Sequence, residues 1–262
     1  MNEVVKIHND LTNEKLGKMG AKELDLFMAI AYKMRDKGTV EVVIPFAEIR
    51  ALSSYSATAN NSLVADLVKA NKRLLEFQFV VEKGSKIYQR TLFKEFVTDT
   101  EQCTLTVAVW DETRYILNDL SRNFTRFELD EFVNLESKYS KRLYKLLKQF
   151  RTQGFYYSKK EEFYRDMDVP DTYKNADFNK RVLKPALEEC KKYIPGLRLE
   201  VMKSGRGAKV HAYVFWFDKE KTDADPEHEP TPKTKKSKNK FNDFSQQNDY
   251  NFDDLEKSLL SN

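Results

Sequence analysis

The sequence predicts an α+β fold made of two tandem winged-helix domains, residues 1–120 and 121–218, followed by a disordered C-terminal tail, residues 219–262. Two observations support this prediction. The order helix, strand, helix, helix and strand hairpin, which is that of a winged helix, can be traced twice along the chain. After residue 218 the composition becomes acidic, then proline-rich, then lysine-rich, and such a segment buries too little apolar surface to fold.

The first domain begins with an amphipathic helix over residues 20–38. Apolar residues recur there every three or four positions, ahead of a cap at Gly38; they are Leu24, Phe27, Met28, Ala31 and Met34. A β-branched strand, TVEVVI, and a short helix after Pro45 come next. We expect a longer helix over residues 57–75, with an apolar side made of Leu63, Val64, Leu67, Val68, Leu74 and Leu75. The runs FVVEKGSKIYQRTLFKEF and TLTVAVW are typical of hairpin strands.

The second domain repeats this order. In its first helix, SKYSKRLYKLLKQFRTQG, the pattern turns Tyr139, Leu143, Leu146, Leu147 and Phe150 inward. The same pattern turns Lys141, Lys145 and Lys148 outward. A strand, FYYS, and a short helix ending before Pro170 precede a helix over about residues 176–192. Two strands, LRLEVMK and KVHAYVFWF, flank the basic turn SGRGA, which would be the wing.

The helix over residues 176–192 has two distinct sides. Its apolar side contains Phe178, Val182, Leu183, Ala186, Leu187 and Cys190. Cys190 is therefore expected to be a small core residue. Pro185 removes one helical hydrogen bond and should bend or loosen the helix. The polar side presents Lys180, Arg181 and Lys184, where a recognition helix in the major groove presents the side chains that read bases and phosphates.

Positive charge is concentrated in the second domain. Residues 1–120 have 16 basic and 17 acidic residues, residues 121–217 have a net charge of +8, and residues 218–262 have a net charge of −3. Residues 137–160 hold eight basic residues and no acidic one. A concentration of one sign on a folded segment favours a polyanion such as DNA as the partner. The candidate contacts are Lys141, Lys145 and Lys148 on the first helix and Lys203, Arg206 and Lys209 at the wing.

Several other classes of protein are disfavoured. No apolar run approaches the ~20 residues that span a bilayer, and the N-terminus lacks a signal peptide, so we expect a soluble, cytoplasmic protein with no membrane contact. Cys103 and Cys190 have no ligand neighbours, so we expect free thiols, no metal and no cofactor. The three histidines are unpaired, unlike those of a rolling-circle nickase, and no glycine-rich phosphate loop is present. We therefore expect no catalytic residue.

The second half also resembles a known family. The run SKYSKRLYKLLKQFRTQG, the segment ending in MDVP, Tyr173, DFNKRVLKPALEE and the LRLEV…HAYVFWF hairpin closely resemble the replication initiators of theta-replicating, iteron-containing plasmids. The opening LTNEKLGKMGAKELDLFMAIAYKM also fits this family, so the resemblance covers about residues 1–217.

The resemblance implies a function for each domain. It implies two winged helices, binding to repeated origin sequences (iterons) in double-stranded DNA, and a homodimer in equilibrium with a monomer. The dimer would repress the initiator's own gene, and the first domain would dimerise. Recruitment of the host initiator and replicative helicase is also implied. In the second domain the recognition helix falls on Lys180, Arg181 and Lys184, while the first domain makes weaker, mostly phosphate contacts through Ser62, Lys69, Lys72 and Arg73.

Two questions stay open at the level of sequence. Winged helices also serve plain transcriptional repressors, and fold alone does not separate that function from initiation. The tail ends in FNDFSQQNDYNFDDLEKSLL, whose aromatic and aliphatic residues are typical of a peptide that docks on a partner, although a tail without a docking role fits the composition as well.

Overall fold

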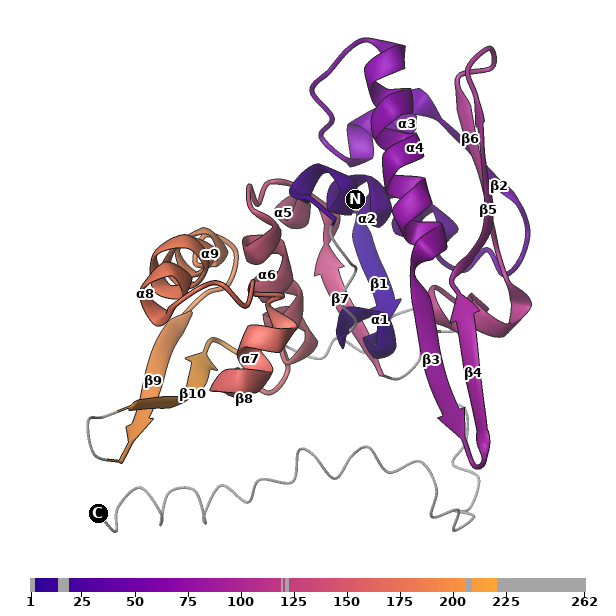
Figure 1. Cartoon of the computed structure of the whole chain (residues 1–262). Helices are drawn as coiled ribbons and strands as arrows, with labels where there is room; N and C mark the ends of the chain where they lie inside the picture. Colours follow the sequence, from indigo (N-terminus) through magenta and orange to yellow (C-terminus); the bar gives the residue numbers. More distant parts are fainter. Residues whose placement is uncertain (1–2, 14–18, 119, 121–122, 206–208, 221–262) are drawn as a thin grey trace. The chain divides into compact units, whose positions relative to one another are not determined.

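One arrangement of strands and helices occurs twice in the computed structural model, which describes residues 3–13, 19–118, 120, 123–205 and 209–220 (Figure 1). Residues 221–262 of the predicted tail and Arg206 lie outside the described residues, whereas Lys219 and Glu220 belong to the described part. The first copy contains β1 (Val4–His8), α1 (Asn9–Asn13), α2 (Ala21–Met34), β2 (Val42–Pro45), α3 (Phe46–Leu52) and α4 (Asn60–Glu76). It continues with β3 (Gln78–Lys83), β4 (Lys86–Thr91), β5 (Phe93–Asp99), β6 (Thr104–Val109) and the 3-10 helix η1 (Asp111–Ile116).

The second copy follows the same order. It contains β7 (Phe124–Glu128), α5 (Leu129–Val133), α6 (Lys138–Gln149), β8 (Phe155–Lys159) and α7 (Lys160–Asp166). Next comes a helix in three parts, α8 (Asn175–Phe178), the π-helical turn η2 (Asn179–Leu183) and α9 (Lys184–Cys190), before β9 (Arg198–Ser204) and β10 (Lys209–Trp216). In each copy a strand, a short helix, a long helix and a hairpin follow one another, which confirms the predicted tandem winged helices.

Each winged helix has its own three-stranded sheet. The strand orders are β2-β6-β5 and β8-β10-β9, so in both sheets the early strand pairs with the last strand of the copy. The strands β3 and β4 form a separate two-stranded hairpin, with Gly84 of its turn in the left-handed region, φ 59°. Glycine tolerates that conformation because it has no Cβ.

The two copies are joined by a ribbon that sequence patterns did not reveal. β1 pairs antiparallel with β7, from Val4 opposite Glu128 to His8 opposite Phe124. Both strands alternate partly exposed and buried residues, and Ile7 and Phe127 are fully buried. Because β7 takes its pairing partner from the first copy, residues 121–218 depend on the first copy for part of their packing.

The helices are amphipathic, as their sequences predict, but α4 departs from the predicted pattern at two residues and the basic side of α6 is buried. Phe27 of α2, Phe46 of α3 and Leu67 of α4 are buried in the first copy. The second copy packs the aromatic rings of Phe163, Phe178, Tyr213 and Phe215 against one another. In α4 the buried residues are Leu63, Leu67, Ala70, Asn71 and Leu74, whereas Val68 and Leu75, expected on the apolar side, are 54% and 39% exposed.

Candidate nucleic-acid interface

The three-part helix α8-η2-α9 presents the basic residues that the sequence places on a recognition helix. Phe178, Val182, Ala186 and Cys190 are fully buried, and this stripe anchors the helix to the core. The Cys190 thiol donates to the Ser140 carbonyl at 3.5 Å, so it is the small core residue predicted from its position. On the other side, Lys180, Arg181 and Lys184 are exposed. The structure therefore brings these three cations together on one solvent-facing surface.

Arg181 is held by neighbours at the start of the helix. Its Nε lies 3.7 Å from Asp177 Oδ1, and its guanidinium carbon lies 5.6 Å from the centre of the Tyr173 ring. Tyr173 comes from the loop before α8, which is closed by a hydrogen bond from its backbone N–H to the Pro170 carbonyl. An arginine stacked on an aromatic face is partly ordered, so it loses less conformational entropy when its guanidinium group binds a ligand.

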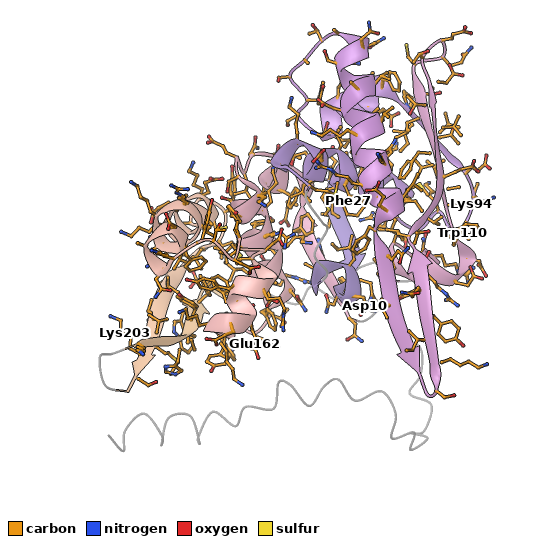
Figure 2. The ribbon with its side chains drawn as sticks, in the orientation of Figure 1. Asp10, Phe27, Lys94, Trp110, Glu162 and Lys203 are labelled. Atoms are coloured by element: carbon orange, nitrogen blue, oxygen red, sulfur yellow. The ribbon has the colours of Figure 1, made fainter. Side chains whose placement is uncertain are left out.

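The wing is the β9–β10 hairpin of the second copy. Lys203 of β9 and Lys209 of β10 are exposed, and the register pairs Val210 with Lys203 (Figure 2). Gly205, at φ 73°, starts the turn between the strands. Lys203 and Lys209 thus sit at the base of one hairpin turn, where side chains of a wing reach the DNA backbone.

The basic helix α6 does not face solvent, and the outward orientation predicted for its lysines is wrong. Lys141, Lys145 and Lys148 are 1%, 5% and 5% exposed. Lys141 Nζ donates to the Phe132 carbonyl at 2.8 Å and lies 2.6 Å from Asp25 Oδ1 in α2. These residues are therefore removed from the set of candidate DNA contacts.

Lys148 is neutralised by acids from three different segments. Its Nζ lies 3.0 Å from Glu128, 3.4 Å from Glu131 and 2.8 Å from Glu220. These pairs raise the pKa of Lys148 although burial opposes them. Burial and the adjacent Arg142 lower the pKa of Lys145 to about 7. The spacing of apolar residues in α6 identified its apolar side correctly. The basic side of α6 is buried as well, because other segments of the chain pack against it.

The first copy presents a weaker basic surface on α4. Ser62, Lys69 and Lys72 are exposed, as expected. Arg73, in contrast, forms an ion pair with Glu23 of α2, whose side chain is 6% exposed, and Lys69 lies 3.3 Å from the same carboxylate. Glu23 also accepts a hydrogen bond from the Gly20 N–H at 2.6 Å. Glu23 therefore offsets part of the positive charge of α4 and holds Arg73 against α2.

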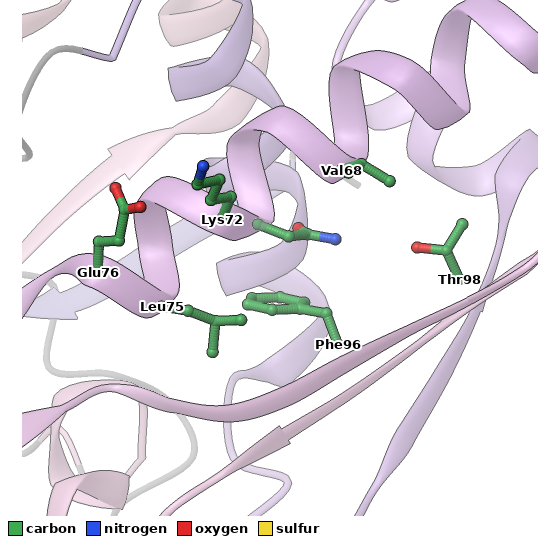
Figure 3. Close-up of a pocket in the computed structure, with 7 residues that line it drawn as sticks. Val68, Lys72, Leu75, Glu76, Phe96 and Thr98 are labelled. Atoms are coloured by element: carbon green, nitrogen blue, oxygen red, sulfur yellow. The ribbon is translucent and has the colours of Figure 1, made fainter.

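Lys72 also lines a shallow groove between α4 and β5. The groove has a volume of about 380 Å³ and includes Val68, Leu75, Phe96 and Thr98 (Figure 3). The two α4 residues that depart from the predicted apolar side, Val68 and Leu75, are thus walls of this groove.

Within the described ranges, no cluster of three His, Cys, Asp or Glu side chains could hold a metal ion. None of the helices described there is long and apolar enough to cross a membrane. The features that stand out are basic and exposed, and they lie on a helix and a hairpin.

Two family models match the chain. The one described as "Initiator Replication protein, WH1" matches residues 4–148, and the one described as "Initiator Rep protein, WH2" matches residues 159–217. The first match extends into the second architectural copy through α6, consistent with the pairing of β1 with β7.

Known proteins give the same assignment. A probable replication protein rep of Bifidobacterium longum (strain NCC 2705) is 39% identical over 222 residues, which are 84% of this chain and 74% of that protein. The crystal structure of the Pi initiator protein in complex with iteron DNA matches with a TM-score of 0.65 and 16% identity, over 82% of this chain and 97% of that one. At this identity the likeness shows the fold alone. The chain therefore belongs to the family of initiator replication proteins, built from two winged-helix domains.

Proposed function

We propose that this protein initiates plasmid replication by binding iterons, directly repeated origin sequences, in double-stranded DNA. The observation that carries the proposal is the exposed set Lys180, Arg181 and Lys184 on a helix whose opposite side is buried. Membership of an initiator family supports it, as does the likeness to the Pi initiator, which was solved with iteron DNA.

In this proposal the α8-η2-α9 helix enters the major groove. Arg181 can pair with O6 and N7 of guanine through two parallel hydrogen bonds, while Lys180 and Lys184 reach a base or a phosphate. Lys203 and Lys209, together with Arg206, contact the backbone beside the helix. Residues 121–218 would thus supply most of the affinity and the sequence preference.

The first domain, residues 1–120, would make auxiliary phosphate contacts through Ser62, Lys69 and Lys72. Arg73 would act through Glu23, by fixing α4 on α2. This domain would also form the homodimer that exchanges with the DNA-binding monomer. The dimer would repress the initiator's own gene, and the monomer would recruit the host initiator and replicative helicase in the cytoplasm, with no chemical step of its own.

The test uses the whole chain, because β7 and Lys141 both have partners in the first copy. Duplexes would be selected from a random pool by the full-length protein, and the enriched sequence would be compared with repeats beside its gene. A plasmid carrying those repeats should be maintained only when the protein is supplied. Selection of a direct repeat without plasmid maintenance would favour the alternative function, a winged-helix repressor. Failure to enrich any sequence would refute the proposal.

A further inference from the structure

The recognition helix contains one turn that is wider than an α-helix. The Lys184 N–H donates to the carbonyl of Asn179, five residues back, whereas in an α-helix it would donate to the carbonyl of Lys180, four residues back. Asn179–Leu183 therefore form a π-helical turn. Such turns account for well under ~1% of residues and occur often at functional sites. Here the turn carries Lys180 and Arg181 themselves.

The spacing of the buried residues shows what the wide turn does. The fully buried stripe Phe178, Val182, Ala186 and Cys190 advances by four residues at every step. In a regular α-helix each such step rotates by about 40° beyond a full turn, so three steps would carry the stripe about 120° around the helix. One extra residue in a turn reverses about 100° of that drift. The π turn therefore keeps the whole stripe against the core.

The wide turn also affects the exposed side of the helix. Lys180 and Lys184 are also four residues apart, and Arg181 adjoins the first of them. Residues four apart share one side of a regular α-helix, about 40° apart around its axis. The wider turn changes that angle, so the directions in which Lys180 and Arg181 project relative to Lys184 depend on the π turn.

Pro185 explains where the wide turn occurs. It is the second residue of α9, it has no N–H to donate, and in a regular α-helix its ring would clash with the carbonyl of Arg181, four residues back. Widening the preceding turn moves that carbonyl away from the ring. Pro185 is exposed, so it is not part of the buried stripe that anchors the helix.

We propose that Pro185 is a positioning residue for DNA recognition: it imposes the π turn and so sets the directions in which Lys180 and Arg181 project relative to Lys184. This inference rests on the proposed function. In a Pro185→Ala variant the restored N–H can donate to the Arg181 carbonyl, and the turn should relax to an α-helix.

The experiment compares full-length wild type, Pro185→Ala and the control Pro195→Ala, which removes an exposed proline beyond the end of α9. Nuclear Overhauser contacts and amide exchange over residues 179–186 report the turn without DNA. Titrations with a duplex selected by the wild type, and with single base-pair variants of it, report recognition. We expect Pro185→Ala to lose the i to i−5 contact, keep its melting temperature within a few degrees, and bind at least about fivefold more weakly. The difference in affinity between the selected duplex and its single base-pair variants should become smaller at a few adjacent positions. Pro195→Ala should match the wild type in the turn, the affinity and the base preferences.

Two results would overturn the inference. Persistence of the π turn in Pro185→Ala would show that the proline does not impose it. A relaxed turn with unchanged affinity and unchanged base preferences would show that the turn does not position the cations. A general loss of helix stability would weaken binding to all duplexes alike, so the base-pair profile separates positioning from a merely structural role. If the wild type selected no duplex, the proposed function would fail, while the spectroscopic result would still decide the role of Pro185 in the turn.

Discussion

Lys141 Nζ of α6 lies 2.6 Å from Asp25 Oδ1 of α2, and this ion pair ties the two winged helices together in the interior of the protein. The lysine side chain is fully buried and that of Asp25 is 12% exposed. Lys141 also donates to the Phe132 carbonyl, so one ammonium group joins α2, α5 and α6. The lysine predicted to meet DNA is instead part of the joint between domains.

Removing one member of this pair should destabilise the protein strongly. At pH 8, where Asp25 is ionised, Asp25→Ala leaves the Lys141 charge buried without its counterion, and we expect a loss of about 3–5 kcal/mol in the free energy of unfolding. The double variant Asp25→Leu/Lys141→Met, which replaces the pair by apolar groups, should be nearly neutral or more stable. Urea denaturation of both variants checks this, and equal losses in the single and double variants would contradict it.

The same pair predicts a pH dependence. Burial raises the pKa of Asp25 from 3.8 to about 7, in spite of the nearby Lys141. The folded state therefore binds the Asp25 proton more tightly than the unfolded state does. The contribution of this proton to the free energy of unfolding is complete below about pH 4 and is lost as the pH rises to about 7. Asp25→Asn should flatten this part of the stability curve, measured as urea midpoints from pH 4.5 to 8. Identical slopes in wild type and Asp25→Asn would rule out the pKa shift.

Sequence patterns identified the amphipathic helices because their apolar periods are local. They did not identify β1 and β7, since five-residue strands are short and their pairing joins residues about 120 positions apart. The buried lysines of α6 were missed for a similar reason. Asp25 and Glu220 lie far from α6 in sequence, and nothing within the helix indicates that its basic side is covered.

The helix predicted over about residues 176–192 was located correctly, and a bend or loosening was expected at Pro185, but the π turn itself was not predicted. The sequence does contain an indication of the wide turn. Pro185 follows residues 179–183, and the buried residues recur at intervals of four; they are Phe178, Val182, Ala186 and Cys190. A helical wheel at a fixed 100° per residue spreads this stripe over a broad arc and conceals the extra residue. Arg73 was placed outward because its partner, Glu23, lies 50 residues away.

Arg181→Ala and Lys184→Ala should each weaken binding to the selected duplex by about 1–3 kcal/mol without changing the fold. Both side chains are exposed, so the circular dichroism spectrum should be unchanged. Lys192→Ala is a matched control, because this exposed lysine follows the end of α9. Wild-type affinity in both variants would place the recognition surface elsewhere.

Deleting residues 221–262 should leave DNA binding nearly unchanged and impair plasmid maintenance. The deletion begins after Glu220, because that carboxylate lies 2.8 Å from Lys148 and belongs to the folded part. The deleted sequence has a net negative charge and aromatic residues suited to a partner protein. A full-length variant with Phe241, Phe244 and Phe252 changed to Ser should show the same defect. Normal maintenance by both variants would remove the docking role.

The salt dependence of binding should separate lysines that meet DNA from lysines that hold the fold. Each phosphate contact releases counterions and adds about −0.9 to the slope of log K against log salt concentration, so Lys203→Ala should reduce the slope by about 1. Lys148→Met should leave the slope unchanged, because its ammonium group is occupied by Glu128, Glu131 and Glu220.

Stability should change in Lys148→Met and not in Lys203→Ala, the reverse of the effect on the salt slope. Lys148→Met leaves three partly exposed carboxylates without their common partner, and we expect a loss of about 1–3 kcal/mol in the free energy of unfolding. Lys203→Ala should change stability by less than about 0.5 kcal/mol, because the side chain is exposed. Titrations at several salt concentrations, with urea denaturation on the same samples, measure both quantities. A reduced salt slope in Lys148→Met with unchanged stability would mean that α6 meets DNA after all.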